Sequence, residues 1–265
     1  MSGEAEIRQV AVDHHHEVAG RFVDYYDKME NDRFSTAFSY GRHKVDVILF
    51  EMLGALPEGA AVLDIGCGTG PYIARIEKMG LKAHGIEPAE AMRAVAVRDN
   101  PSSDIRDGLA TALPFDDASL DFVMAIEVYR YLSESDFAES MQECMRVLRP
   151  GGRVFFTMVN KYALDGFYLL QRLRQGLRGV SYDNAHPHCT FYTPGDVRDV
   201  LSTAGFEEVE TIDRLFGPMR MAYKLSESLG AKLARKVEPL DDLLSAQSFM
   251  SGLGGHLIGT ATRPR

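Results

Sequence analysis

Short apolar runs alternate with amphipathic stretches along most of the chain. The runs at 61–65, 120–126 and 154–158 are apolar except for one polar residue each, and each is preceded or followed by glycine or acidic residues, which is typical of buried strands. Between them, apolar residues recur at three- and four-residue spacing, the period of a helix that buries one face. This alternation predicts an α/β fold.

The other elements follow from capping residues and from shorter patterns. Residues 1–55 are predicted to be helical, apart from a turn-like aromatic stretch at 34–42. Capping residues begin two further helices, at 133–148 and 193–205. The remaining predicted elements are strands at 81–87, 206–212 and 256–262 and a helical stretch at 217–250.

A glycine-rich turn follows the strand at 61–65. Gly66, Gly68 and Gly70 lack a Cβ, so the turn can adopt positive φ and a ligand can lie against the backbone. Pro71 then begins a helix whose first N–H groups can face that ligand. A tight turn without a ligand is the alternative, but it would not need the entropic cost of so many glycines.

The nine residues Val62–Gly70 resemble the first motif of the class I S-adenosyl-L-methionine-dependent methyltransferases, in the subgroup with small-molecule acceptors. Two later blocks extend the resemblance: Leu113-Pro114-Phe115 with Asp121-Phe122-Val123, and Leu148-Arg149-Pro150-Gly151-Gly152 before a strand. The likeness covers about 60–160 and 190–262.

The resemblance implies a doubly wound, mostly parallel seven-stranded sheet, the Rossmann-like methyltransferase fold. A helical N-terminal cover is expected over residues 1–55 and a methyltransferase core over 56–265. Lid insertions in that core are expected at about 160–190 and 214–250.

Glu87 ends the second strand and is the clearest candidate for a cofactor side chain. A carboxylate can accept both ribose hydroxyls of an adenosine, and such charge-assisted bonds contribute about 1.5–3 kcal/mol each. The same acid would hold the ribose of NAD, so Glu87 alone indicates only an adenosine ligand. The G-x-G-x-G spacing, in place of G-x-G-x-x-G, counts against an NAD-dependent oxidoreductase.

The resemblance implies S-adenosyl-L-methionine as the cofactor and a set of contacts to it. Arg42 is expected to meet the methionine carboxylate, Met92 to lie against the adenine, and the backbone of Leu109 to receive the adenine edge. Asp107 lies two residues before Leu109 and is not expected to reach the adenine. The full predicted set is Arg42, Asp64, Gly66, Cys67, Gly68, Gly70, Glu87, Pro88, Met92, Leu109, Ala110 and Ile126.

The expected reaction needs neither a metal nor a covalent enzyme intermediate, because the methyl group of a sulfonium is already activated. The protein must align a nucleophile with the S–CH3 bond and exclude water. An acceptor hydroxyl also needs a base, for which His186, His188 and Glu127 are the candidates. The run at 14–16 is interpreted as a solvated helix face, since adjacent histidines on a helix diverge.

Composition narrows the setting. The chain has 265 residues and a net charge of −9, and this negative charge argues against nucleic acid as a partner. The sequence shows no signal-peptide or membrane-spanning pattern, which favours a cytoplasmic protein. Arginine and lysine nevertheless exceed acids in 160–190 and 214–236, which would favour an anionic acceptor or an anionic surface. A small-molecule acceptor is expected, with oxygen or nitrogen favoured over carbon, and the oligomeric state is open. A non-catalytic cofactor-binding module is the remaining alternative.

Overall fold

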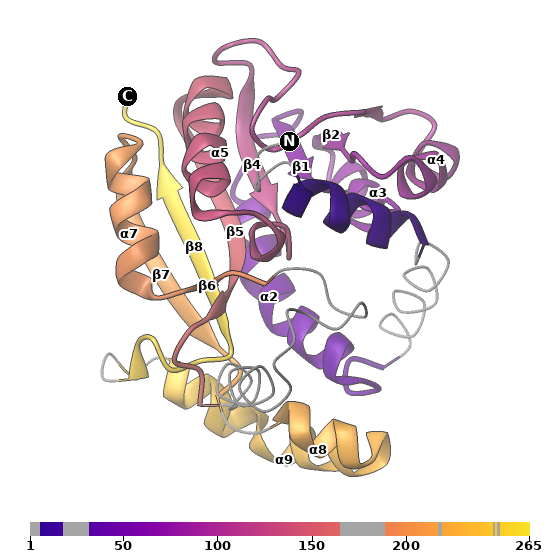
Figure 1. Ribbon diagram of the computed structural model, residues 1–265, viewed down its shortest axis with the longest axis vertical. Coiled ribbons are helices and arrows are strands. Elements are labelled where there is room, and N and C mark those ends of the chain that lie inside the picture. The colour runs from indigo at the N-terminus through magenta and orange to yellow at the C-terminus, as the bar shows by residue number, and fades with distance from the viewer. Residues whose placement is uncertain (1–5, 18–31, 165–188, 217–218, 246, 248–249) are drawn as a thin grey trace.

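The computed structural model describes residues 6–17, 32–164, 189–216, 219–245, 247 and 250–265. Its centre is a twisted sheet in the order β3-β2-β1-β4-β5-β8-β7 (Figure 1). All neighbours along this path pair in parallel except β8, which runs antiparallel to both β5 and β7. The predicted α/β class and the mostly parallel seven-stranded order are therefore confirmed. An eighth strand, the two-residue β6, pairs with the end of β5 and was not predicted.

The elements are as follows. The strands are β1 (Ala61–Ile65), β2 (Lys82–Ile86), β3 (Asp104–Arg106), β4 (Leu120–Ala125), β5 (Leu148–Asn160), β6 (Phe191–Tyr192), β7 (Glu207–Arg214) and β8 (His256–Thr262). The helices are one at residues 6–17, then α2 (Ala37–Gly54), α3 (Pro71–Lys78), α4 (Glu90–Asp99), α5 (Glu134–Val147), α7 (Pro194–Thr203), α8 (Met219–Leu225) and α9 (Glu227–Ser245), with a 3-10 turn η1 (Tyr129–Tyr131).

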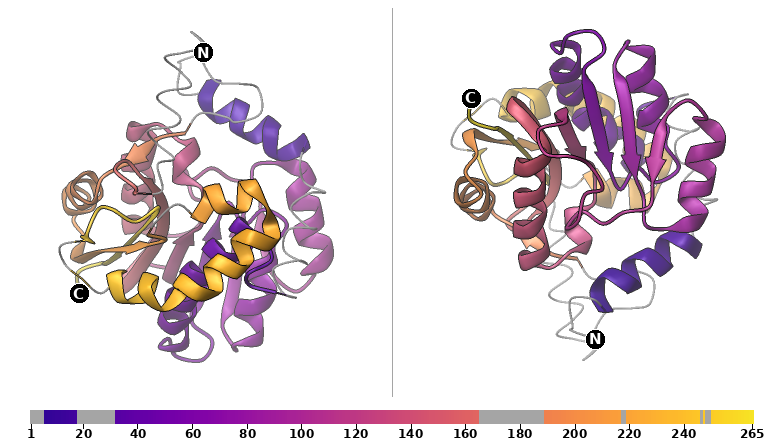
Figure 2. Two further views of the ribbon diagram at one scale, coloured as in Figure 1. Left: turned by 90° about the horizontal axis from the view of Figure 1, so that it is seen from below. Right: turned by 90° about the horizontal axis from the view of Figure 1, so that it is seen from above.

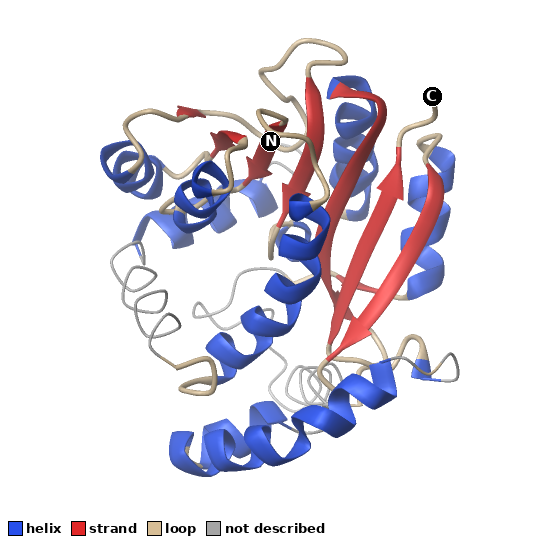
Figure 3. Ribbon diagram, turned by 180° about the vertical axis from the view of Figure 1, so that it is seen from behind, coloured by secondary structure: helices blue, strands red, loops and turns tan. Residues whose placement is uncertain are grey.

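Helices cover both faces of the sheet, as a doubly wound fold requires (Figures 2 and 3). Successive residues of a strand point to opposite faces, so Val123 of β4 packs with α5 and α7 while Phe122 packs with α2 and α3. Phe137 and Leu201 are fully buried on the first face, and Leu49 is fully buried on the second. Because both faces of the central strands β1 and β4 are buried, these strands are apolar except for one aspartate each, whereas the edge strand β7 is largely polar.

The sequence pattern predicts the start of one helix correctly and the start of another incorrectly. Thr193 accepts from the backbone N–H of Asp196 and donates its own N–H to the Asp196 carboxylate, the predicted capping box of α7. The predicted turn at 34–42 is wrong over its second half, because α2 begins at Ala37. Thr36 caps α2 by accepting from the N–H of Ser39 at 3.0 Å.

The parallel strands β1, β2, β4 and β5 end at one edge of the sheet, and β8 begins there. Ligands of open α/β sheets bind beyond this carboxyl edge. Helices α8 and α9 lie across the same end of the molecule (Figure 1). Among the described residues, no helix combines the length and the apolar character needed to cross a membrane.

Candidate functional site

The loop between β1 and α3 turns through three glycines with positive φ. The φ angles of Gly66, Gly68 and Gly70 are 66°, 58° and 81°, a region that residues with a Cβ avoid. A Cβ on Gly66 would lie 2.7 Å from Cγ2 of Val128, in the loop after β4. The glycine loop therefore contacts the loop beyond the central strand, and the contact leaves no room for a side chain at Gly66.

Glu87 follows β2 and turns its carboxylate back to the glycine loop. Its Oε2 accepts the backbone N–H of Gly68 at 3.0 Å, and its Oε1 accepts the N–H of Ala89 at 2.8 Å. Glu87 is only 6% exposed. Burial raises the pKa of its carboxyl, while these two hydrogen bonds and the nearby Arg93 act in the opposite direction. Each carboxylate oxygen can still accept a further hydrogen bond from a ligand.

The residues predicted to lie at the adenine differ in how exposed they are. Met92 is buried, and its Sδ lies 3.7 Å from where a Cβ on Gly68 would stand. Leu109 is 40% exposed. The Asp107 carboxylate is largely exposed and pairs with Nη1 of Arg93 at 3.0 Å. Arg93 therefore holds Asp107 at the surface.

Arg42 is a buried cation in the second turn of α2. Its guanidinium lies 5.2 Å from the ring centroid of Phe38 and 5.6 Å from that of Tyr72. Burial raises the pKa of Asp64, inside β1, to about 8; Arg42 opposes this rise, and the carboxylate of Glu87 adds to it. At neutral pH the carboxyl of Asp64 is therefore mostly protonated.

A second charged cluster lies directly after β4 and centres on Glu127. The Glu127 carboxylate accepts Nη1 of Arg130 at 3.0 Å and the Thr157 hydroxyl at 3.2 Å, and Nδ1 of His256 lies 3.4 Å away. The backbone of Glu127 has a φ of 62°, and its N–H donates to the Thr157 hydroxyl at 2.8 Å. Residues other than glycine adopt such a φ only where the surroundings enforce it.

The cations around Glu127 decide its charge. Burial by itself would raise the pKa of this carboxyl, but His256, Arg130 and Arg42 together hold it well below its usual range. Glu127 is consequently a firmly ionised anchor for these cations and a weak base. The neighbouring Arg130 also stacks on Tyr131, 5.3 Å from its ring centroid.

The helix at residues 6–17 lies beside this edge. Nη1 of Arg8 donates to the Asp136 carboxylate at 2.8 Å, which ties the helix to the start of α5. The His15 ring meets the Tyr131 ring edge to face, with centroids 5.0 Å apart. The helix therefore closes one side of the loop that carries Glu127.

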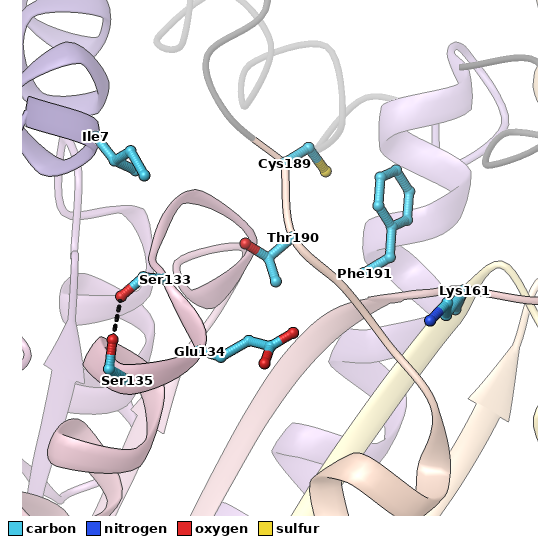
Figure 4. Close-up of a pocket in the computed structure, with 8 residues that line it drawn as sticks. All are labelled: Ile7, Ser133, Glu134, Ser135, Lys161, Cys189, Thr190 and Phe191. Carbon is cyan, nitrogen blue, oxygen red and sulfur yellow. Dashed lines mark hydrogen bonds between the residues drawn. The ribbon is translucent and has the colours of Figure 1, made fainter. Parts of the chain in front are cut away.

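An open cavity of about 470 Å³ lies between this helix, the start of α5 and the strand pair β5–β6. Figure 4 shows its lining, with Glu134 between Ile7 and Ser133 on one side and Lys161 and Phe191 on the other. None of the predicted site residues that the structure describes is among its lining residues. The cavity is thus separate from the glycine loop.

The structure places the predicted residues as follows. Those at Asp64–Gly70 and Glu87–Met92 gather around one loop, while Arg42 contributes charge to both Asp64 and Glu127. His186 and His188 lie outside the described residues. The described histidines, including 14–16, form no cluster of three or more groups that could hold a metal.

Pattern alone missed Arg130, Thr157 and above all His256. His256 is the first residue of β8 and pairs in register with Val159 near the end of β5. Because β8 is antiparallel, its first residue lies where the parallel strands end. The signal that could have found it is topological: the histidine opens an antiparallel last strand.

Comparisons with known proteins find methyltransferases among the relatives of this chain. The family described as "Methyltransferase domain" matches residues 63–156. The chain is 28% identical to a ubiquinone biosynthesis O-methyltransferase of Rhizobium leguminosarum, with 69% of this chain and 75% of that one covered. It is 30% identical to a probable S-adenosylmethionine-dependent methyltransferase of Mycolicibacterium smegmatis, with 67% of this chain and 63% of that one covered.

The fold has solved counterparts. A methyltransferase of Thermotoga maritima, described as S-adenosylmethionine-dependent and as a possible histamine N-methyltransferase, superposes with a TM-score of 0.58 at 20% identity. The superposition covers 93% of this chain and 99% of that one. At this identity the likeness concerns the fold.

Proposed function

The chain belongs to the class I S-adenosyl-L-methionine-dependent methyltransferases, and from that premise we propose how it holds its cofactor and where its acceptor reacts. The reaction moves the methyl group of S-adenosyl-L-methionine to an oxygen or nitrogen of a small organic molecule. The observation that carries the proposed site is the buried Glu87 carboxylate, bonded to Gly68 beside a loop of positive-φ glycines.

The residues around the glycine loop fit this cofactor. Glu87 accepts the two ribose hydroxyls, which suits a buried carboxylate with lone pairs left to share. Arg42 meets the methionine carboxylate, because it is a buried cation whose charge reaches Asp64 in the strand before the glycine loop. Met92 and the backbone of Leu109 flank the adenine.

The acceptor lies beyond β4, next to the Glu127 cluster. The bound cofactor supplies an activated methyl group, so the chain has to place the acceptor atom, exclude water and handle one proton. Glu127 stays ionised 3.4 Å from Nδ1 of His256, so the uncharged imidazole takes the acceptor's proton at Nε2 and the resulting imidazolium pairs with the Glu127 carboxylate. Arg42 and Arg130 add positive charge, which favours an acceptor that is anionic or becomes an oxyanion.

Calorimetry with S-adenosyl-L-methionine tests the cofactor site. Glu87→Ala should weaken binding at least tenfold, about 1.4 kcal/mol, because the ribose hydroxyls lose a buried acceptor. Glu90→Ala is the matched control, since it removes a neighbouring carboxylate that is exposed. An affinity unchanged by Glu87→Ala would remove Glu87 from the site.

Turnover tests the activity itself. Incubation with the cofactor and a panel of phenols and amines should yield S-adenosyl-L-homocysteine. Tight cofactor binding without this product for any acceptor would favour a non-catalytic binding module. Binding of NAD in place of S-adenosyl-L-methionine would favour an oxidoreductase.

A further inference from the structure

Helices α8 and α9 expose a row of large apolar side chains. Leu225 is 80% exposed, and Leu240 and Leu243 are 53% and 59% exposed. The full row is Met221, Leu225, Leu229, Leu233, Leu240 and Leu243. A contiguous apolar surface of this kind on a soluble domain usually marks an interaction site.

The row is not the packing face of α9. Leu229, Leu233, Leu240 and Leu243 recur at helical spacing and lie on one side of the helix. The buried residues Gly230, Ala234 and Asp241 lie on another. A Cβ on Gly230 would lie 2.4 Å from the Tyr223 ring, so α9 packs closely on α8 through that second side.

Three of the four acids of α9 have hydrogen-bond partners elsewhere in the protein, and the fourth, Glu227, is exposed at the start of the helix. Asp241 accepts the backbone N–H of Phe216 at 2.6 Å. Glu238 accepts from Arg33 at 3.0 Å, and Asp242 accepts from Nζ of the buried Lys44 at 2.6 Å. These carboxylates are therefore neutralised by partners in the core and in the loop before α2.

The lysines are turned the other way. Lys224, Lys232 and Lys236 are exposed, and within the described part of the chain none has an ion-pair partner. By helical spacing, Lys232 and Lys236 fall on the side of α9 that carries the leucines. The three paired acids and the lysines thus lie on different sides of α9, with the lysines among the leucines.

We propose that this leucine–lysine face (Met221 to Leu243 of α8 and α9) docks on the surface of an anionic lipid bilayer. A helix with leucines on one side and lysines beside them lies in the interfacial plane, where the leucines enter the acyl boundary and the lysines meet anionic headgroups. A symmetric contact with a second copy would place these lysines against each other. A protein of net charge −9 would otherwise be repelled by such a membrane, so the local lysines carry the attraction.

The leucine–lysine face lies at the same end of the molecule as the candidate site. Helices α8 and α9 cross the end of the molecule where β4 and β5 end (Figures 1 and 3). Glu127 and His256 lie at that same edge. Docking would therefore bring the acceptor side of the site toward the bilayer. Docking of the leucine–lysine face does not depend on which molecule is methylated.

Co-sedimentation with vesicles tests the proposal. The full chain should bind vesicles of phosphatidylcholine with 30% phosphatidylglycerol and should bind pure phosphatidylcholine vesicles far less. Lys232→Gln with Lys236→Gln should lower the partition coefficient about 30-fold, since each lysine contributes about a factor of five near an anionic surface. Leu229→Gln with Leu240→Gln and Leu243→Gln should lower it at least tenfold, because three apolar side chains no longer enter the acyl boundary.

The matched control replaces apolar residues of similar exposure elsewhere. Val10→Gln with Val97→Gln removes two exposed valines from other helices and should leave binding unchanged. Circular dichroism and cofactor affinity verify that each variant is folded. The proposal is overturned if wild-type protein ignores the anionic vesicles, or if the leucine variant binds them like wild type. It is also overturned if light scattering shows a dimer that the leucine substitutions dissociate.

Discussion

The two ends of the site are held together by different forces. Around the glycine loop the structure depends on shape, because Gly66 and Gly70 adopt conformations and close contacts that a side chain would prevent. Around Glu127 it depends on charge, because Arg130 and His256 gather on one ionised carboxylate. A small change of volume should therefore damage the first region most, and a change of charge the second.

The largest effect should come from adding bulk to the glycine loop. Gly66→Val places a Cβ 2.7 Å from Val128 at a φ of 66°, and we expect cofactor affinity to fall at least a hundredfold, about 2.7 kcal/mol. Gly59→Val is the control, since Gly59 also has positive φ but open space around it. This control separates the effect of backbone strain at positive φ from the effect of the clash with Val128. Equal loss of cofactor binding in both variants would refute the argument from shape.

Removing the charge of Glu127 should have the next largest effect. Glu127→Gln leaves Arg130 and His256 without their anion, and we expect the free energy of unfolding to fall by about 2 kcal/mol. Denaturant titration measures this loss. Adding Arg130→Gln should recover part of it, because the second change removes a cation left without its partner. Cofactor affinity should change less than threefold, and a larger loss would mean that the two regions are not separable.

The pH dependence of cofactor binding should report the protonation of Asp64, the carboxyl on the glycine-loop side that the charge of Arg42 also reaches. The pKa of Asp64 is raised to about 8 from an ordinary value of 3.8, so the carboxyl holds its proton at neutral pH. A cationic ligand beside it favours the charged form, so binding releases the proton and affinity rises with pH up to about 8. We expect up to about a tenfold gain from pH 6.5 to 7.5. Calorimetry should show this gain in wild type and not in Asp64→Asn, which also controls for titration of the cofactor's own amino group.

The smallest effects should come from the adenine edge. Asp107 is largely exposed and pairs with Arg93, and exposed pairs contribute about 0–1 kcal/mol. We expect Asp107→Asn and Leu109→Ala each to change cofactor affinity less than threefold. A loss of tenfold or more in Asp107→Asn, measured by calorimetry, would show that Asp107 does reach the adenine.

The comparison also shows what a sequence can and cannot reveal. Gly68 and Glu87 belong to one β–α–β unit, so a local pattern places them beside each other, and the structure does bring them together. Arg42 was expected in a turn, yet it lies inside α2 because Thr36 caps the helix earlier than the apolar spacing indicated. His256 meets Glu127 only through the antiparallel pairing of β8, which no local pattern encodes.

The same strand constrains how the molecule can be assembled during synthesis. Strand β7 pairs only with β8 among the described strands, and β8 follows it in sequence after α8 and α9. Until β8 leaves the ribosome, β5 and β7 both present open hydrogen-bonding edges, the surfaces from which strands mispair. The sheet can thus grow from β1 to β5 early, but β7 joins it only when β8 arrives. His256 therefore reaches Glu127 in the same folding event that completes the sheet.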